Sequence, residues 1–137
     1  MMDDFTCIFP TRIIFGKNSV DQLGIVAARY GKKALLVTGQ GSVKKNGLYD
    51  RSLELLKENG LEIFELQGIK PNPLLSDCIK GVDICKKNSV EVIIGLGGGS
   101  VLDTAKSISA GALYDGDLWD FHTGKANIER TLPVISV

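Results

Sequence analysis

An apolar segment, Val90–Leu96, runs directly into three glycines and then into a helical pattern, and this succession limits the folds open to the chain. A strand that is apolar throughout is typical of a parallel sheet covered on both faces. The turn Gly97–Ser100 then opens a helix, whose first N–H groups lack partners inside the helix and lie at the positive end of its dipole. Such a helix start is suited to bind a phosphate group.

Strand patterns alternate with helical patterns along the rest of the chain. The expected strands are Lys33–Thr38, Glu62–Leu66, Glu91–Gly95 and Leu132–Val137, and the expected helices are Asn18–Tyr30, Leu48–Asn59, Leu74–Lys87 and Val101–Leu113. Tyr114–Arg130 is expected to be a polar loop, and Phe5–Phe15, broken by Pro10, to be one bent strand or two short ones. The alternation predicts an α/β fold, a Rossmann-like parallel sheet with helices on both faces.

The composition excludes several classes of protein. The 137 residues carry no net charge, which gives no sign of nucleic-acid or membrane binding. No apolar run approaches the roughly 18 residues of a membrane span, and the acidic start of the chain is unlike a secretory signal. Cys78 and Cys85 lie seven residues apart on an expected helix and are interpreted as small core side chains. We therefore expect a reduced, cytoplasmic protein.

The triple glycine matches neither common phosphate motif in full. The chain contains no Gly-Lys-Ser/Thr, which excludes a P-loop. The dinucleotide fingerprint G-x-G-x-x-G is nearly met by Gly95–Ser100, with serine in the last position. However, this turn does not follow the first strand, and no acidic residue stands at a strand end about twenty positions on. A tight turn without a ligand therefore remains an alternative.

A second glycine cluster, Gly39–Ser42, follows another apolar strand. In open parallel sheets, ligands bind outside the carboxyl ends of the strands. Two glycine-rich turns at this edge indicate one elongated ligand with separated phosphate or ribose groups. Ser42, Lys44 and Lys45 would add a hydroxyl and two cations, and no aspartate stands at the strand end to repel a further phosphate. The alternative is that the two lysines lie on a solvated loop.

Several motifs resemble the iron-containing (group III) alcohol dehydrogenases, and in particular their NADP-dependent butanol dehydrogenase-like branch. They are Gly97-Gly98-Gly99-Ser100 with Asp103, Ala105 and Lys106, the segment Pro10–Gly16, Pro71-Asn72-Pro73, the run Leu35–Asp50 and the segment Trp119–Lys125. The resemblance spans the chain but covers only the amino-terminal part of that family's length. It implies that residues 1–137 are a truncated nucleotide-binding domain with a dehydroquinate synthase-like fold, and that the helical carboxyl-terminal domain is absent.

The resemblance also implies roles for individual residues in binding a dinucleotide. Gly97, Gly98, Gly99 and Ser100 would hold the pyrophosphate, Asp103 would lie near the nicotinamide, and Asn72 near the ribose. Gly39, Gly41 and Ser42 would accommodate the 2′-phosphate of NADP, because NAD-preferring relatives carry aspartate at position 39; NAD is the less favoured cofactor. From the residues alone, Ser100 and Asp103 also have the spacing of a capping box. Lys106 is interpreted as a partly exposed helix lysine, with a role in cofactor binding as the alternative.

The chain lacks the histidines that would hold the family's metal. Its one histidine, His122, is interpreted as a loop residue, so iron or zinc would be bound only by the complete enzyme and this chain would supply no catalytic or metal-binding residue. The resemblance implies the NADP-binding half of an enzyme that transfers hydride between NADP(H) and a small alcohol or aldehyde.

One alternative is a non-catalytic nucleotide-binding module or remnant that needs a separate helical domain. Another is the glycerol dehydrogenase or dehydroquinate synthase side of the superfamily, against which Gly39 and Trp119–Lys125 argue. Uncovered apolar surface predicts possible self-association.

Overall fold

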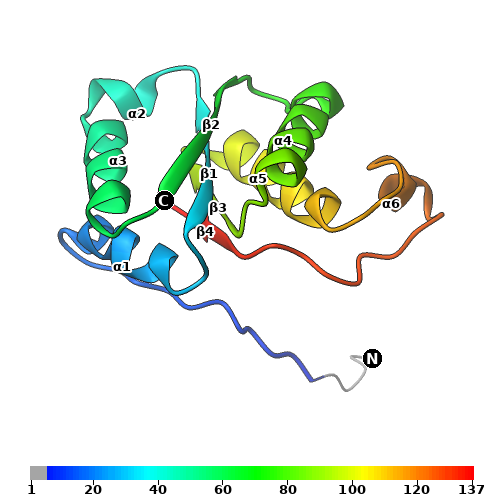
Figure 1. Ribbon diagram of the computed structural model, residues 1–137, viewed down its shortest axis with the longest axis horizontal. Helices are drawn as coiled ribbons and strands as arrows, with labels where there is room; N and C mark the ends of the chain where they lie inside the picture. Colours follow the sequence, from blue (N-terminus) through cyan, green and yellow to red (C-terminus); the bar gives the residue numbers. More distant parts are fainter. Residues whose placement is uncertain (1–5) are drawn as a thin grey trace, which may run out of the picture.

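Four parallel strands form one sheet in the computed structural model, which describes residues 6–137 (Figure 1). The strands are β1 (Lys33–Gly39), β2 (Glu62–Ile69), β3 (Val92–Leu96) and β4 (Val134–Ser136), and they lie in the order β2-β1-β3-β4. Leu36 on β1 lies opposite Glu65 on β2 and Ile94 on β3, and Ile94 lies opposite Ile135 on β4. The predicted parallel sheet is confirmed.

Helices cover both faces of this sheet, as the alternating pattern predicts (Figure 1). One face carries the short 3-10 helix η1 (Ser19–Gln22), α1 (Leu23–Ala28) and α3 (Leu48–Glu58), and the other carries α4 (Leu75–Asn88) and α5 (Gly99–Ala112). Two further helices of one turn each, α2 (Ser42–Lys45) and α6 (Asp120–Thr123), lie in connections. The chain therefore has the doubly wound architecture that places ligands at the carboxyl edge of a sheet.

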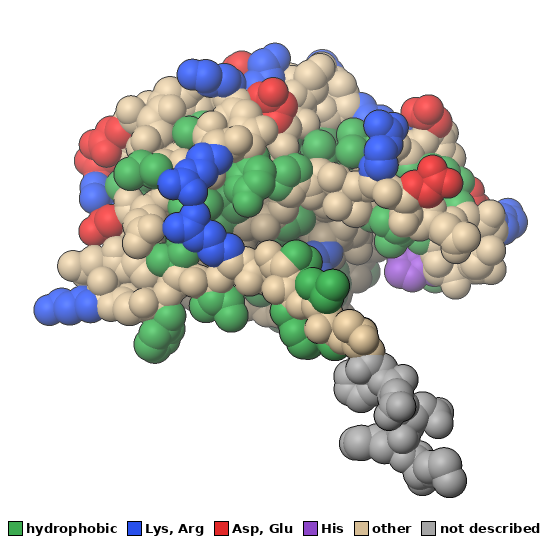
Figure 2. Space-filling model, turned by 90° about the horizontal axis from the view of Figure 1, so that it is seen from below, with side chains coloured by type: hydrophobic (Ala, Val, Ile, Leu, Met, Phe, Trp, Pro, Cys, Tyr) green, Lys and Arg blue, Asp and Glu red, His purple; other side chains and the backbone are tan. Residues whose placement is uncertain are grey.

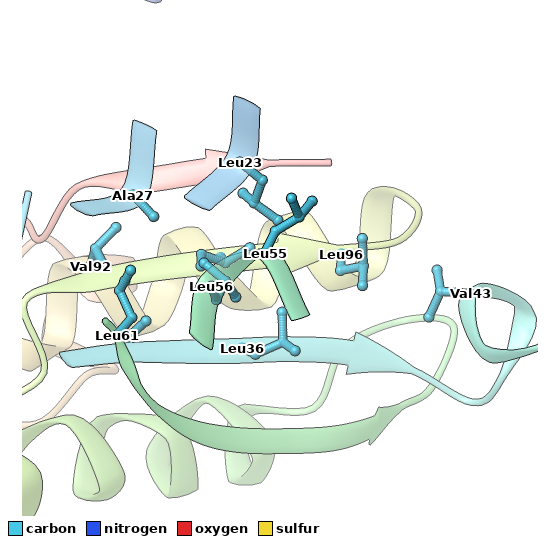
Figure 3. Close-up of a cluster of buried hydrophobic side chains, with 11 residues drawn as sticks. Leu23, Ala27, Leu36, Val43, Leu55, Leu56, Leu61, Val92 and Leu96 are labelled. Atoms are coloured by element: carbon cyan, nitrogen blue, oxygen red, sulfur yellow. The ribbon is translucent and has the colours of Figure 1, made fainter. Parts of the chain in front are cut away.

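Two apolar layers hold the helices against the sheet. Successive residues of a strand point to opposite faces, so Leu36 packs with Ala27 and Leu56 in one layer (Figure 3), while Ile93 packs with Ile108 in the other. All five of these side chains are fully buried. Burial of each leucine or isoleucine contributes about 1.5–3 kcal/mol, which makes the two layers the main source of stability.

The two cysteines expected in the core lie on the face of α4 that packs against the sheet and α5. Cys78 and Cys85 are buried, and burial raises the pKa of the Cys85 thiol to about 12. Between them, Gly81 lies so close to α5 that a Cβ atom built on it would come within 2.6 Å of Ile108 Cγ1. The prediction that these cysteines are core side chains is confirmed.

The predicted strand or strands at Phe5–Phe15 are wrong for the part that the structure describes. Residues 6–15 form an extended arm without a strand partner among residues 6–137, and Phe5 lies outside the described residues. The side chains of Phe9 and Phe15 are 85% and 98% exposed. A β-rich pattern gives a strand only where a neighbouring strand accepts its hydrogen bonds, and the arm has none.

Smaller differences concern the ends of elements. The helix predicted over 18–30 consists of η1 and α1 and ends at Ala28, and the loop predicted over 114–130 contains α6. Strand β2 continues beyond the predicted end at Leu66 to Ile69, past an irregularity in its pairing with β1. In this described part of the chain, every helix is too short or too polar to span a bilayer.

Candidate functional site

A pocket of about 490 Å³ opens at the carboxyl edge of the sheet, between the ends of β1 and β3. These two strands are neighbours, but the chain leaves β1 toward β2 on one side and returns with β3 on the other. Such a reversal of strand order leaves a crevice above the sheet, and ligands of open α/β sheets bind there. The lining residues are Gly39, Gln40, Gly41, Ser42, Lys45, Ile69, Pro71, Gly98, Gly99, Ser100 and Val101.

One wall of the pocket is the start of α5. Val101 N donates to Gly98 O at 3.0 Å, whereas the N–H groups of Gly98, Gly99 and Ser100 donate no hydrogen bond within residues 6–137. A Cβ atom built on Gly98 or Gly99 would meet nothing within 4 Å, so the backbone is open to an approaching ligand. Three free donors at the start of a helix of 14 residues favour an anion.

Gly97 directly precedes the N-cap of α5 and does not line the pocket. Its φ of 149° lies in the region that favours glycine, and a Cβ atom there would come within 3.0 Å of Val101 Cγ2. Its N–H donates to Val137 O at 3.0 Å, which ties the turn to the end of the chain beyond β4. Gly97 is therefore required by the turn itself, while Gly98 and Gly99 leave room above it.

The opposite wall is the end of β1 and the helix that follows it. Gly39, Gly41 and Ser42 line the pocket, and Gly41 O accepts hydrogen bonds from Lys44 N and Lys45 N at 3.2 Å each. A Cβ atom built on Gly39 would lie 3.5 Å from Val101 Cγ2 on the other wall. The structure thus brings both predicted glycine turns to one pocket, at the edge that the sequence indicated.

Besides Gly97, two further predicted site residues lie outside the pocket lining, Asn72 and Asp103. Asn72 is exposed beside Pro71, which does line the pocket, and adopts a φ of 61°. Asp103 is exposed on α5, about one turn beyond Ser100. Contact of either residue with a cofactor stays a prediction.

The capping-box interpretation of Ser100 and Asp103 is wrong. Helix α5 begins at Gly99, with Gly98 as its N-cap and no capping hydrogen bond from a side chain. Ser100 is therefore already inside the helix, and Asp103 lies beyond the first turn. Because glycine can begin a helix without a side-chain cap, the helix starts earlier than the serine suggests.

Sequence reasoning missed four residues of the lining: Gln40, Ile69, Pro71 and Val101. Ile69 is buried at the end of β2, where the predicted strand stopped three residues too early. An apolar residue just before the rigid Pro71–Pro73 segment was the signal for a longer strand. The pocket therefore has a third contributor, the carboxyl end of β2.

The described residues do not form a metal site. Residues 6–137 contain no group of three or more His, Cys, Asp or Glu side chains that could hold an ion. His122 lies on α6 rather than in a loop, exposed on the surface (Figure 2), with its ring 5.1 Å from that of Trp119. The donor set that iron or zinc would need is not present in this part of the chain.

Fold and pocket together define a doubly wound α/β domain with a crevice at its switch point. The sequence model of one protein family, iron-containing alcohol dehydrogenase, matches residues 10–137. The chain belongs to the iron-containing alcohol dehydrogenase family.

Individual relatives agree with this assignment. NADH-dependent butanol dehydrogenase A of Clostridium acetobutylicum is 42% identical over 136 residues, which are 99% of this chain and 35% of the relative. The NADPH-dependent aldehyde reductase YqhD of Escherichia coli is 35% identical over 97% of this chain and 34% of its own length. The crystal structure of a butanol dehydrogenase from Thermotoga maritima, also called NADH-dependent, superposes with a TM-score of 0.95 at 45% identity, covering 98% of this chain and 34% of that one. The chain thus spans about a third of these relatives.

Proposed function

We propose that residues 1–137 form the nucleotide-binding domain of an iron-containing alcohol dehydrogenase, and that the pocket at the carboxyl edge holds the dinucleotide. The observation that carries this proposal is that Gly98, Gly99 and Ser100 line the pocket and that their three N–H groups have no partner in the described chain. They offer a pyrophosphate hydrogen bonds at the positive end of the α5 dipole. The family's two cofactor types both carry that pyrophosphate.

The proposed cofactor is NADP(H) in preference to NAD(H). No carboxylate lines the pocket, and Gly39 ends β1 where an aspartate would bind the ribose hydroxyls and repel a 2′-phosphate. The names of the relatives divide on this point: the two butanol dehydrogenases are called NADH-dependent and the aldehyde reductase NADPH-dependent. The preference therefore rests on the charge and shape of the pocket in this chain.

The reaction proposed for the complete protein is hydride transfer between the nicotinamide cofactor and a small alcohol or aldehyde. The chain contributes the position of the cofactor, and no step is assigned to a metal because the described residues offer no donor set. We expect the isolated chain to bind cofactor without turnover. A cytoplasmic location, supported by three unpaired cysteines, and self-association belong to the same proposal.

The non-catalytic binding module remains the second candidate. The observation that favours it is the same missing donor set within residues 6–137. A full-length protein that binds the dinucleotide but shows no metal-dependent turnover of any alcohol or aldehyde would support this candidate over the enzyme.

The proposal is tested by thermal unfolding of the chain with increasing NADPH or NADH. A ligand that binds only the folded state stabilises it by about 2.7 kcal/mol at a hundredfold excess over Kd. We expect a rise in Tm with both dinucleotides, larger with NADPH. No rise with either would contradict dinucleotide binding, and a larger rise with NADH would contradict only the preference.

A matched pair of variants separates a ligand site from a mere tight turn. Gly98→Val adds a side chain where a Cβ atom meets nothing, at a φ of −83° that valine can adopt, so the fold should keep its Tm. The added methyl groups occupy the space above the free N–H groups and should abolish the stabilisation by NADPH. Ala28→Ser, an exposed change at the end of α1, is the control and should leave both quantities unchanged. If Gly98→Val unfolds the chain, the tight-turn interpretation holds instead.

A further inference from the structure

The chain contains two Asn-Gly pairs, Asn46-Gly47 and Asn59-Gly60, each at the end of a helix. Their backbones have nearly the same conformation: Asn46, the C-cap of α2, has φ −95° and ψ 4°, and Asn59, the C-cap of α3, has φ −93° and ψ 12°. The glycine that follows has a φ of 77° in the first pair and 76° in the second. A difference in reactivity between the two pairs therefore comes from their surroundings.

In an Asn-Gly pair the main chain can attack the asparagine side chain. The glycine nitrogen gives its proton to hydroxide and forms a bond to asparagine Cγ, the Cγ–Nδ2 bond breaks, and Nδ2 takes a proton from water and leaves as ammonia. Water then opens the cyclic imide at either carbonyl, which gives aspartate or isoaspartate without any oxidation. Glycine favours this reaction because it has no Cβ atom to obstruct its nitrogen. The reaction requires a glycine N–H that is weakly held and an asparagine side chain that can lie against it.

Asn59 is held away from this reaction by two hydrogen bonds. Its Nδ2 donates to Leu55 O at 2.8 Å, so the leaving group is tied to the preceding turn of α3. Gly60 N donates to Lys57 O at 2.9 Å, an ordinary length, so the proton of the nucleophile is engaged as well. The side chain is also half-buried, and a Cβ atom built on Gly24 of α1 would collide with Asn59 Nδ2. Both reacting groups are therefore fixed by the fold.

Asn46 has the opposite surroundings. It is exposed, and its Nδ2 donates no hydrogen bond within residues 6–137. Its Oδ1 accepts from Leu48 N at 3.1 Å, which turns the side chain toward the following main chain and makes Cγ more electrophilic. Gly47 N donates to Lys44 O at 3.3 Å, longer than the usual range for such a bond. The leaving group is thus free and the nucleophile only weakly held.

We propose that Asn46 is a site of spontaneous deamidation, and that the fold protects Asn59 in the same dipeptide. This inference goes beyond the proposed function, since the reaction needs only water. The product places a negative charge in the connection between α2 and α3, and isoaspartate also lengthens the main chain there by one methylene group. Because Ser42 and Lys45 of α2 line the pocket, the modification falls beside one of its walls.

The test is incubation of the folded chain in mildly alkaline buffer, followed by mass spectrometry of the peptides made by trypsin. Trypsin cleaves after lysine or arginine except before proline, so Asn46 lies in peptide 46–51 and Asn59 in peptide 58–80. Asn72, in the second peptide, precedes a proline that has no N–H to react. Since Asn59 must break two hydrogen bonds, we expect peptide 46–51 to deamidate at least about tenfold faster. In urea at the same pH the two rates should be similar.

A matched pair of variants assigns the reaction to one residue. Asn46→Gln keeps the amide, but its longer side chain forms the ring far more slowly, so the acidic species in ion-exchange chromatography should nearly disappear. Asn59→Gln should accumulate that species at the rate of the unsubstituted chain. Equal rates at the two sites of the folded chain, or a faster rate at Asn59, would overturn the inference. So would a rate at Asn46 that folding slows as strongly as the rate at Asn59. These measurements use no nucleotide, so their outcome is independent of the proposed function.

Discussion

Gly39 at the end of β1 faces Val101 on α5 across the floor of the pocket, and a Cβ atom built on Gly39 would lie 3.5 Å from Val101 Cγ2. This is an ordinary van der Waals distance, and the next neighbour, Ile69 O, would be 3.7 Å away. Position 39 therefore has room for a side chain, and its glycine is not required by packing. Packing therefore does not explain why a glycine, rather than a residue with a carboxylate, stands at this position.

The first prediction is that Gly39→Asp reverses the cofactor preference. The new carboxylate would accept hydrogen bonds from the ribose hydroxyls of NADH and repel the 2′-phosphate of NADPH. We expect the ratio of the two Kd values, measured by titration, to shift at least about tenfold toward NADH, which is about 1.4 kcal/mol. The Tm without ligand should stay close to that of the unsubstituted chain.

Gly39→Asn is the control for this experiment, since it has nearly the same shape without the charge. It should weaken NADPH binding far less than Gly39→Asp does. Equal effects of the two variants would mean that crowding, and not charge, sets the preference.

The sequence was sufficient to predict the sheet because its central strands are buried on both faces. The run around Leu35 and the run around Ile93 are apolar at nearly every position, and Gly60 follows the end of α3 between them. Those signals are local and strong. The arm over residues 6–15 shows the limit: its β-rich pattern is as clear, but a strand depends on a partner that no local pattern supplies.

The candidate site was predictable in its backbone and not in its side chains. The glycine turns at Gly39 and Gly98 follow predicted strands, so their meeting at one edge follows from parallel topology. Lys44 and Lys45, in contrast, could not be told apart, because what separates them is a hydrogen bond from Lys44 to Gln67, which is distant in sequence. Likewise Ile69 was missed because β2 continues past an irregularity in its pairing.

A second prediction concerns the crossing of α4 and α5 at Gly81. A methyl group on Gly81 would approach both Cγ1 and Cδ1 of Ile108, which is fully buried and has little room to move. Alanine gains about 1 kcal/mol of helix propensity over glycine, whereas overpacking costs about 1–3 kcal/mol. We expect Gly81→Ala to lower the free energy of unfolding in urea by about 1 kcal/mol.

A double-mutant cycle tests the cause of that loss. Ile108→Val removes Cδ1 and alone costs about 0.5–1.5 kcal/mol. Since it also makes room for the new methyl group, the double variant should be less destabilised than the sum of the single variants, by about 0.5 kcal/mol or more. Strict additivity would show that the two residues do not compete for the same space.

The third prediction is a pH dependence that arises at Glu91. Its Oε2 accepts hydrogen bonds from Lys32 N at 2.6 Å and Lys33 N at 3.1 Å, which lower the pKa of Glu91 from its ordinary 4.5. A carboxyl whose folded pKa is lowered stabilises the fold above pH 4.5, and this contribution is lost as the pH falls through the folded pKa.

Glu91→Gln should therefore reduce the free energy of unfolding near neutral pH and make no difference in strong acid. Urea unfolding of both chains across that range measures the effect. Glu129→Gln changes an exposed carboxylate in the connection before β4. The free energy of unfolding of this variant should differ from that of the unsubstituted chain by the same amount at every pH. A Glu91→Gln effect of the same size at every pH would assign the loss to shape rather than charge.

The fourth prediction is self-association through the arm over residues 6–15. Ile8, Phe9, Ile13 and Phe15 are 80–98% exposed there. Figure 2 shows hydrophobic side chains along the segment that leads to the grey residues. Exposed apolar groups gathered on one segment are uncommon on monomeric proteins and favour association, each buried aromatic ring removing about 150–250 Å² from water. We expect the unsubstituted chain to elute as a species larger than a monomer, with a mass by light scattering that rises with concentration.

The double variant Phe9→Ser and Phe15→Ser should shift that equilibrium toward the monomer, because it removes the two aromatic rings of the described arm. Tyr30→Ser is the control: this aromatic side chain is 51% exposed but lies outside the arm, after α1. Its mass profile should match that of the unsubstituted chain. If the arm variant associates as strongly as the control, the contact is made by another surface, and a chain that is monomeric at every concentration would contradict self-association altogether.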